Sequence, residues 1–357
     1  NAQEMFTGTK DVADTHKFDE SNLEAWMAEH VEGFEGPLTV KQFKGGQSNP
    51  TYKLFAGGKT YVMRRKPPGK LLPSAHAVDR EFRVIDALYP LGFPGARPYG
   101  LCMDESVVGT IFYIMDCVEG RILWDGTLPG VDPAERRAIY EAKVKTFADL
   151  HNVDWRAAGL EGFGKEADYI ARQTHRWTKQ YVASETSKIY DMDALIDWLP
   201  KNIPAGDMTT IVHGDYRLDN MILHPTDPKV IAVLDWELCT LGDPLADFTY
   251  HLMNWVMPSS DPARGALVDI EDLKSYGIPT MEEYTALYCQ HTGRDGLPEV
   301  DYYFAYNAFR LAAICQGIVG RVRDGTASNA AAATMEARVA PLAAFAADCA
   351  RKAGMEG

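Results

Sequence analysis

Two kinds of hydrophobic spacing divide the chain near residue 118. Between residues 38 and 115, apolar and polar residues alternate in short runs that glycine and proline interrupt, which is typical of strands joined by turns. From residue 119 onward, apolar residues recur at steps of three and four, as they do in amphipathic helices. The pattern predicts an α+β protein with a small β-rich lobe over residues 1–118 and a larger helical lobe over residues 119–357.

The individual elements follow from the same spacing. Residues 1 to about 18 are expected to be loosely ordered, and Gly57-Gly58 is expected to turn one strand back antiparallel to the next. In the first lobe, helices are predicted at 23–31 and 77–88, and strands at 38–43, 51–55, 61–65, 99–103 and 110–115. In the second lobe, short strands are predicted at 210–212 and 230–234, and helices at 133–151, 167–185, 192–201, 247–256, 281–291, 301–323 and 329–351.

Charge and composition disfavour several classes of protein. The formal net charge of −14 argues against a general affinity for nucleic acid or for an anionic membrane, since both need a cationic face. The first residues lack the apolar core of a signal peptide, and no apolar run reaches the ~20 residues that span a bilayer. The six cysteines form no Cys-x-x-Cys pair, which favours free thiols in a reducing compartment. We therefore expect a cytoplasmic protein without nucleic-acid or membrane partners, and its oligomeric state stays open.

The strongest chemical signal is the segment His213-Gly214-Asp215, followed five positions later by Asn220. In the phosphoryl-transfer template, an aspartate accepts the proton of the acceptor hydroxyl and an asparagine at this spacing ligates magnesium. Asp235 follows an apolar run and supplies a second metal ligand to bridge the phosphates. Each residue alone is typical of a polar loop, but their order and spacing together predict a kinase that uses ATP and Mg²⁺, with Asp215 as the catalytic base.

These motifs, together with the segment from Leu241 to Asp247, resemble the aminoglycoside phosphotransferase and choline-kinase-related superfamily. Within it, the stretches 45–52, 61–69 and 213–220 are similar to kinase-like domains found alone in bacteria or fused to acyl-CoA dehydrogenases. The resemblance covers most of the chain and implies a bilobed protein-kinase-like fold. Protein kinases have His-Arg-Asp where this chain has His213-Gly214-Asp215, and Asp-Phe-Gly where it has Asp235-Trp236-Glu237. These departures disfavour a protein kinase.

The resemblance also implies nucleotide contacts in the first lobe. Ser48 and Asn49, in the turn after the first strand, would contact the β- and γ-phosphates. Arg64 stands where antibiotic kinases have a lysine that holds the α- and β-phosphates, and its neighbours leave the exact cation open. Glu81 on the following helix would pair with this cation and fix its direction.

Two further sets of residues receive roles from the same resemblance. The adenine would bond to backbone at the passage between the lobes, through the C=O of Asp116 and the N–H of Val118. Asp243 and Asp247, at the start of a helix, and His213 are expected to be structural supports of the catalytic loop.

Arg217 is the residue that bears on the acceptor. An arginine two positions after Asp215 would repel a polycation and favour a carboxylate or phosphate on the acceptor, although pairing with Glu237 or Asp219 is an equal alternative. A basic pocket could be extended by three arginines of one late helix: Arg310, Arg321 and Arg323.

Three functions therefore stay open. The first is a kinase for a small-molecule hydroxyl on a hydroxy acid or hydroxyacyl-CoA, which the subgroup and Arg217 favour. The second is an aminoglycoside kinase. The third is a nucleotide-binding regulatory pseudokinase, which the presence of Asp215, Asn220 and Asp235 disfavours. The choice between ATP and GTP is not determined by the pattern, and ATP is the default.

Overall fold

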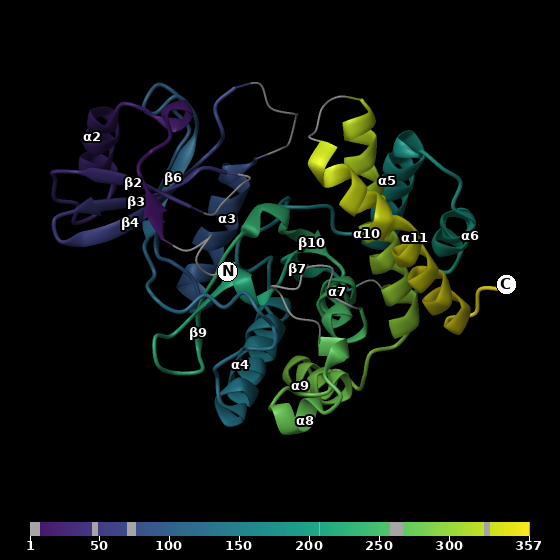
Figure 1. The fold of residues 1–357 in the computed structure, drawn as a ribbon. Coiled ribbons are helices and arrows are strands. Elements are labelled where there is room, and N and C mark those ends of the chain that lie inside the picture. Colours follow the sequence, from purple (N-terminus) through teal and green to yellow (C-terminus); the bar gives the residue numbers. More distant parts are fainter. Residues whose placement is uncertain are drawn as a thin grey trace.

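The computed structural model describes residues 8–44, 49–69, 76–206, 208–257, 267–324 and 329–356. The chain folds into a smaller lobe built on an antiparallel sheet and a larger helical lobe, which lie side by side (Figure 1). The expected α+β, bilobed architecture is confirmed. The predicted boundary near residue 118 falls in the segment between the last strand of the sheet and the first helix of the larger lobe.

The sheet of the smaller lobe is antiparallel throughout and has the strand order β1-β2-β3-β4-β6-β5. Two helices pack with this sheet, α2 (Glu20–His30) and α3 (Val78–Leu88). The strands are β1 (Thr9–Lys10), β2 (Thr39–Phe43), β3 (Thr51–Ala56), β4 (Lys59–Arg65), β5 (Pro98–Cys102) and β6 (Phe112–Asp116).

Strand alternation gives this sheet two different faces. One face packs against α2 and forms the core of the smaller lobe, with side chains such as Tyr52, Leu54 and Met63. The intervening residues of the same strands, such as Thr51, Lys53 and Arg64, point to the opposite side and line a pocket toward the larger lobe. The register of β3 and β4 therefore decides which side chains point into the pocket.

The expectation of loose order for residues 1 to about 18 is wrong for the part that the structure describes. Thr9 pairs with Phe43 in the sheet, and the Gln42 side chain accepts a hydrogen bond from Ala13 N at 3.0 Å. Asp14–His16 forms a short 3₁₀ helix, and Tyr52 donates a hydrogen bond to its last carbonyl at 3.1 Å. These contacts join residues about 30 positions apart, so no local pattern could have indicated them.

The larger lobe consists of helices around two small two-stranded sheets, β7 with β10 and β8 with β9. The strands are β7 (Thr210–Val212), β8 (Met221–Leu223), β9 (Val230–Val233) and β10 (Thr240–Gly242). The helices are α4 (Pro133–His151), α5 (Tyr169–Ser184), α6 (Tyr190–Trp198), α7 (Pro244–Val256), α8 (Leu273–Tyr276), α9 (Met281–Thr292), α10 (Val300–Arg323) and α11 (Asn329–Lys352). The sequence did not predict β8, β10 or α8, whose three or four residues are too short to show a period.

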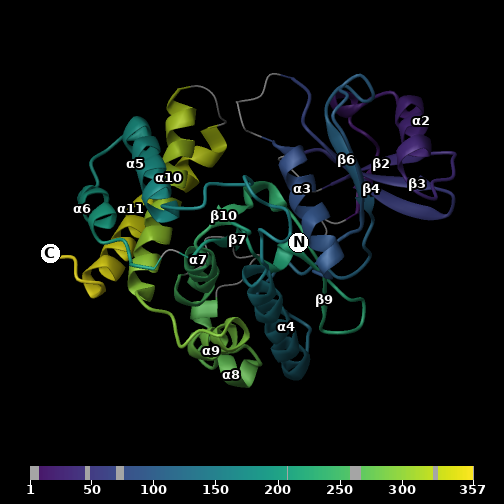
Figure 2. The ribbon, with the colours of Figure 1, turned by 180° about the vertical axis from the view of Figure 1, so that it is seen from behind.

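Helix α10 is the centre of the part of the lobe farthest from the sheet. It packs along α11 and contacts both α5 and α7 (Figures 1 and 2). Both views place α5, α10 and α11 on the side of β7 and β10 that faces away from the six-stranded sheet. The six-stranded sheet and the helices α5, α10 and α11 therefore lie on opposite sides of these central strands.

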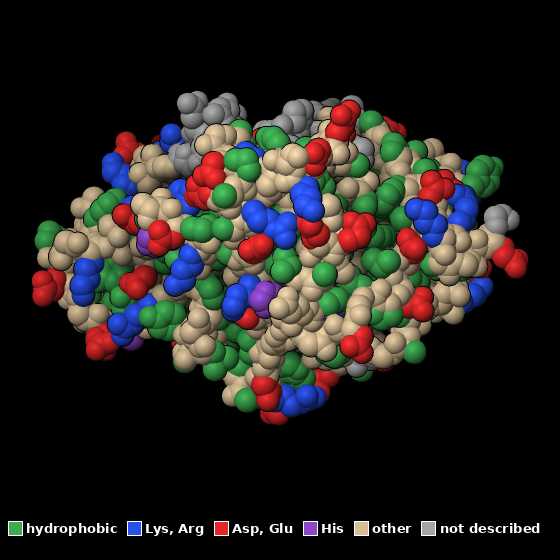
Figure 3. Space-filling view, turned by 90° about the horizontal axis from the view of Figure 1, so that it is seen from below, with side chains coloured by type: hydrophobic (Ala, Val, Ile, Leu, Met, Phe, Trp, Pro, Cys, Tyr) green, Lys and Arg blue, Asp and Glu red, His purple; other side chains and the backbone are tan. Residues whose placement is uncertain are grey.

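Among the described residues, no helix is both long enough and apolar enough to cross a bilayer. On the face shown in Figure 3, acidic and basic side chains are interspersed and do not gather by sign. The six cysteines are all free, and five of them are buried.

Candidate active site

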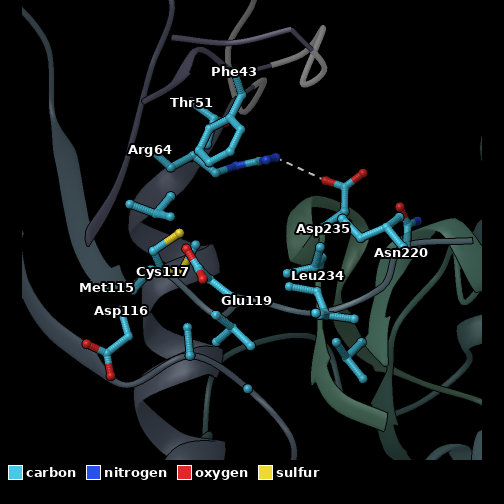
Figure 4. Close-up of a pocket in the computed structure, with 18 of the residues that line it drawn as sticks. Phe43, Thr51, Arg64, Met115, Asp116, Cys117, Glu119, Asn220, Leu234 and Asp235 are labelled. Carbon is cyan, nitrogen blue, oxygen red and sulfur yellow. Dashed lines mark hydrogen bonds and ion pairs between the residues drawn. The ribbon is translucent and has the colours of Figure 1, made fainter. Parts of the chain in front are cut away.

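A pocket of about 830 Å³ lies between the N-terminal sheet and the β8–β9 hairpin (Figure 4). This volume is within the range of small-molecule and cofactor sites, which are lined mainly by apolar side chains. The apolar lining comes from both lobes and includes Phe43, Val62, Ile85, Met115, Ile222 and Val233. The sequence analysis did not assign these residues, although the positions of Phe43, Val62 and Met115 in predicted strands were a usable signal.

Arg64 of β4 joins the two lobes at one end of this pocket. Its Nε lies 2.7 Å from Oε2 of Glu81, and its terminal nitrogen lies 3.0 Å from Oδ1 of Asp235 (Figure 4). Glu237 is a more distant partner, at 3.8 Å. Burial lowers the pKa of Arg64, but Glu81 and the other neighbouring acidic groups outweigh burial and raise it above its usual value. The guanidinium is therefore a fixed positive charge beside the pocket.

Glu81 of α3 is the buried anchor of this arrangement. Its side chain is 1% exposed and accepts hydrogen bonds from Asn49 Nδ2 at 2.8 Å and from the Tyr113 hydroxyl at 3.1 Å. Burial raises the pKa of Glu81, and the charge of Arg64 opposes that shift. Asn49 also contacts His76 Nδ1 through its Oδ1, at 2.9 Å. The expected Arg64–Glu81 contact is thus present and Asn49 joins it, whereas Ser48 lies outside the described residues.

The passage between the lobes offers backbone groups to the other end of the pocket. Asp116 and Val118 both line it, but the Asp116 carboxylate accepts a hydrogen bond from the Tyr99 hydroxyl at 2.6 Å and points away from Arg64 and Asp235 (Figure 4). No hydrogen bond among the described residues uses the Val118 N–H. Both observations agree with a backbone contact to a base at this position.

The predicted catalytic residues Asp215 and Asn220 contact each other beside the pocket. Asn220 Nδ2 donates to the Asp215 carbonyl at 2.9 Å and to its carboxylate at 3.2 Å. These donations orient the amide so that its oxygen is left to accept or to coordinate. Asn220 and Asp235 both line the pocket, and their side chains lie next to each other in Figure 4.

This pair of oxygen donors suits Mg²⁺. Magnesium takes one or two protein carboxylate or amide oxygens and fills its remaining positions with water and phosphate oxygens. No group of three or more His, Cys, Asp or Glu side chains within the described ranges could hold a metal alone. A magnesium ion held by Asn220 and Asp235 would take its remaining ligands from water and phosphate oxygens.

The backbone of the catalytic loop is held by Asp247 of α7. Its carboxylate accepts hydrogen bonds from His213 N at 2.7 Å and Gly214 N at 3.0 Å. Burial raises the pKa of Asp247, but the hydrogen bond and charge of His151 and the contacts of His213 outweigh burial and lower it. Asp247 is thus held as an anion that supports the loop.

Two further residues shape the loop. His213 is fully buried and its Nε2 lies 2.9 Å from the Leu234 carbonyl, which links the loop to the segment that carries Asp235. Gly214 has φ +85°, and a side chain there would lie 3.0 Å or less from Leu238. A glycine is required at this position by both conformation and space.

Arg217 contacts Asp215, the predicted base. Its Nε lies 3.2 Å from Oδ1 of Asp215, and its terminal nitrogen lies 3.2 Å from Oδ2 of Asp219. The pairing with Asp219 is one of the two alternatives that the sequence left open. The contact with Asp215 could not be read from the pattern, because it depends on how the loop bends.

The three arginines of α10 do not form one site. Arg323 is exposed and bonds to Asp324, and Arg321 is exposed near the same end of the helix. Arg310 lies about 16 Å farther toward the start of the helix, at about 1.5 Å per residue over the intervening 11 residues. Only Arg310 is in a position to face the interior of the lobe.

Known proteins resemble this chain over most of its length. The model of the family described as "Phosphotransferase enzyme family" matches residues 39–284. Acyl-CoA dehydrogenase family member 10 of Mus musculus is 46% identical over 319 residues, which cover 89% of this chain and 30% of that protein. Acyl-CoA dehydrogenase family member 11 of Homo sapiens is 44% identical over 348 residues, which cover 94% of this chain and 44% of that protein. The chain spans less than half the length of these two relatives.

A solved structure shows the same architecture. It comes from Ralstonia eutropha jmp134, is provisionally named an aminoglycoside phosphotransferase, and is 51% identical to this chain. The match covers 94% of this chain and 99% of the other, with a TM-score of 0.86.

Proposed function

The chain belongs to the phosphotransferase enzyme family, and from that premise we propose that it transfers the γ-phosphoryl group of Mg-ATP to the hydroxyl of a hydroxy acid or its CoA thioester. Family membership makes it an enzyme that phosphorylates a small-molecule hydroxyl. The observation that carries the proposed phosphoryl transfer is that Asn220 and Asp235 line one inter-lobe pocket beside Arg64, while the Asn220 amide donates a hydrogen bond to the Asp215 carboxylate.

In this proposal, the nucleotide lies in the pocket with its base against the backbone of Asp116 and Val118. Arg64 binds the phosphates, and its direction is fixed by Glu81 at 2.7 Å. Asn220 and Asp235 would hold magnesium, which neutralises the phosphates when it is bound. This arrangement places the terminal phosphate beside the catalytic loop.

Asp215 is the proposed general base. Its carboxylate accepts the proton of the acceptor hydroxyl as that oxygen forms a bond to the γ-phosphorus and the bond to the β-phosphate oxygen breaks. Asn220 Nδ2 and Arg217 Nε hold the carboxylate from two sides, each at 3.2 Å. Their contacts restrict the aspartate to one direction, which is the main requirement for in-line transfer.

The acceptor class rests on two supports. Relatives that match this chain over 89% to 94% of its length are named for acyl-CoA substrates, and a kinase domain joined to such an enzyme suits an acyl-CoA or acid substrate. In this proposal, an anionic group of the acceptor takes the place of Asp219 beside Arg217, which disfavours polycationic aminoglycosides. A regulatory pseudokinase is disfavoured because a binding module has no use for Asp215.

The test is ADP release from Mg-ATP with two acceptor pools, after subtraction of the rate without acceptor. One pool contains hydroxy acids that differ in chain length and hydroxyl position, with their CoA thioesters; the other contains aminoglycosides. Stimulation by the first pool alone supports the proposal. Stimulation by the aminoglycosides alone, or ATP binding without stimulation by either pool, contradicts it.

A further inference from the structure

Arg310 lies against aromatic rings, and Asp247 is a nearby carboxylate that acts on its charge without an ion pair between them among the described residues. Its guanidinium carbon lies 5.0 Å from the ring centre of Tyr250 on α7 and 5.9 Å from that of Trp177 on α5. No ion pair of the described residues involves Arg310, and its side chain is only partly exposed between these helices. We call Arg310, Trp177, Tyr250 and Tyr306 the aromatic arginine site.

Two polar atoms of this site are also without a partner among the described residues. The Tyr306 hydroxyl and the Trp177 Nε1 are both buried and make no hydrogen bond there. Burial of unbonded polar groups is unfavourable, so such groups usually mark a place where water or a ligand binds. Burial lowers the pKa of Arg310, but Tyr306 and the other neighbouring phenols, with Asp247, outweigh burial and raise it. The site therefore holds a permanent positive charge with donors around it.

The aromatic arginine site lies behind the catalytic loop as seen from the nucleotide pocket. None of its four residues lines that pocket, and α5 and α10 lie on the opposite side of β7 and β10 (Figures 1 and 2). It is nevertheless joined to the loop through α7. His251, which follows Tyr250, contacts the carbonyl of Tyr216 at 3.1 Å, and the phenol of Tyr250 acts electrostatically on both Arg217 and Arg310.

We propose that the aromatic arginine site binds the anionic group of the acceptor and so makes the enzyme selective for hydroxylated acids. An unpaired guanidinium with flat rings against it can bind a carboxylate or a phosphate by two parallel hydrogen bonds, and it repels an ammonium group. The acceptor then extends from Arg310, past Tyr250, to the carboxylate of Asp215. This inference rests on the proposed function, because it names what that function selects.

The experiment uses the full chain with Arg310→Gln, Arg310→Lys and the control Arg321→Gln, which removes an exposed arginine of the same helix. The probes are the most active hydroxy acid of the pool, its methyl ester and its CoA thioester. We expect Arg310→Gln to raise KM for an anionic acceptor by at least ~10-fold, with kcat within ~3-fold and KM for ATP unchanged. Arg310→Lys should recover part of the loss, and Arg321→Gln should resemble the parent.

The probes also identify which anion is bound. A loss confined to the free acid assigns the site to a carboxylate, and a loss confined to the thioester assigns it to a phosphate of CoA. Equal losses for the acid and its neutral methyl ester overturn the inference, as does an unchanged KM for both anions. Thermal melting of each variant shows whether a loss comes from unfolding. If Arg310→Gln does not fold, the same comparison of acid, ester and thioester is made with Arg310→Lys.

A binding readout separates this inference from the proposed function. Saturation-transfer NMR measures binding of the hydroxy acid pool to the parent and to the variants without ATP. Binding that depends on Arg310 in a chain that turns over none of these acids supports the site and rejects the proposed function. Turnover with no dependence on Arg310 rejects the site and leaves the proposed function standing. Absence of binding to the parent rejects the site.

Discussion

The proposed nucleotide side and the proposed acceptor side of this molecule are built in different ways. On the nucleotide side, the functional charges are paired with each other: Arg64 contacts Glu81 at 2.7 Å and Asp235 at 3.0 Å. On the acceptor side, Arg310 has aromatic neighbours and no carboxylate partner in the described part of the chain. A site whose charges are already balanced must exchange partners when it binds its ligand, whereas an unbalanced site takes its missing partner from the ligand.

The two sides also differ in what positions them. The nucleotide side depends on a β-sheet and on two loops held by Asp247 and His213, which form a rigid network of hydrogen bonds. The acceptor side depends on the packing of α5, α7 and α10 against one another. We therefore expect substitutions on the first side to change KM for ATP and those on the second side to change KM for the acceptor. Asp215 serves both sides.

The largest expected effect is at Asp215. Both sides depend on this residue, so its substitution should lower turnover with every acceptor alike. Asp215→Asn keeps the shape of the side chain but cannot accept the hydroxyl proton, so kcat should fall by at least ~10²-fold with every acceptor. The affinity for Mg-ATP should stay unchanged, because the phosphate contacts are made elsewhere. Steady-state rates and nucleotide titration measure the two effects. Asp227→Asn, in an exposed turn of the same lobe, is the control. Unchanged turnover of Asp215→Asn would remove this residue from the role of base.

The second largest effect is expected at Glu81, and it should change the kinetic constant for ATP but not that for the acceptor. Glu81→Gln removes the charge that fixes Arg64 while it keeps a similar shape, and hydrogen bonds between charged groups contribute about 1.5–3 kcal/mol. KM for ATP should rise by ~10-fold or more, and KM for the acceptor should change little. Asp86→Asn, an exposed change on the same helix, should leave both constants as they are. A larger change for the acceptor than for ATP would contradict the division into two sides.

The smallest effect concerns Lys143, which touches neither ligand in this account. It lies in α4 with 3% exposure, and burial lowers its pKa to about 7, although the charge of Asp219 opposes that shift. An unfolded lysine titrates near about 10.4, so between about pH 7 and 10 the unfolded chain binds a proton that the folded chain lacks. The free energy of unfolding should therefore rise with pH over this window because of Lys143.

Lys143→Met tests this by removal of the titrating group. The variant should be more stable than the parent by about 1 kcal/mol or more near pH 7, and the difference should shrink as the pH rises. Urea unfolding at about pH 7 and about pH 9 measures it, with the exposed Lys145→Met as the control. A difference that is the same at both values of pH would show that Lys143 does not titrate in this window.

The comparison also explains how much could be predicted from the sequence. Asp215, Asn220 and Asp235 could be predicted as one group because one loop and one strand end carry them at fixed spacing, and their catalytic role stays a prediction. The apolar lining of the pocket followed the alternation of β3, β4 and β6, which the sequence showed but did not assign to a ligand. The strand β1 and the Arg217–Asp215 contact could not be predicted, since each depends on packing between residues or on the bend of a loop.

The acceptor side shows the limit most clearly. Trp177, Tyr250 and Arg310 stand on three helices, 60 or more positions apart, and no motif relates them. The sequence grouped Arg310 with Arg321 and Arg323 because they share a helix. The structure separates them, since Arg323 bonds to Asp324 and Arg310 faces two aromatic rings.

The most direct test of the central claim is the fate of an acceptor hydroxyl labelled with heavy oxygen. The protein is incubated with Mg-ATP and a hydroxy acid whose hydroxyl carries the label, and the product is analysed by mass spectrometry with fragmentation. Attack by the hydroxyl on the γ-phosphorus predicts a phosphate monoester that retains the label in the bridge between carbon and phosphorus. An acyl phosphate on the carboxylate, or inorganic phosphate with an unchanged acceptor, would contradict the account.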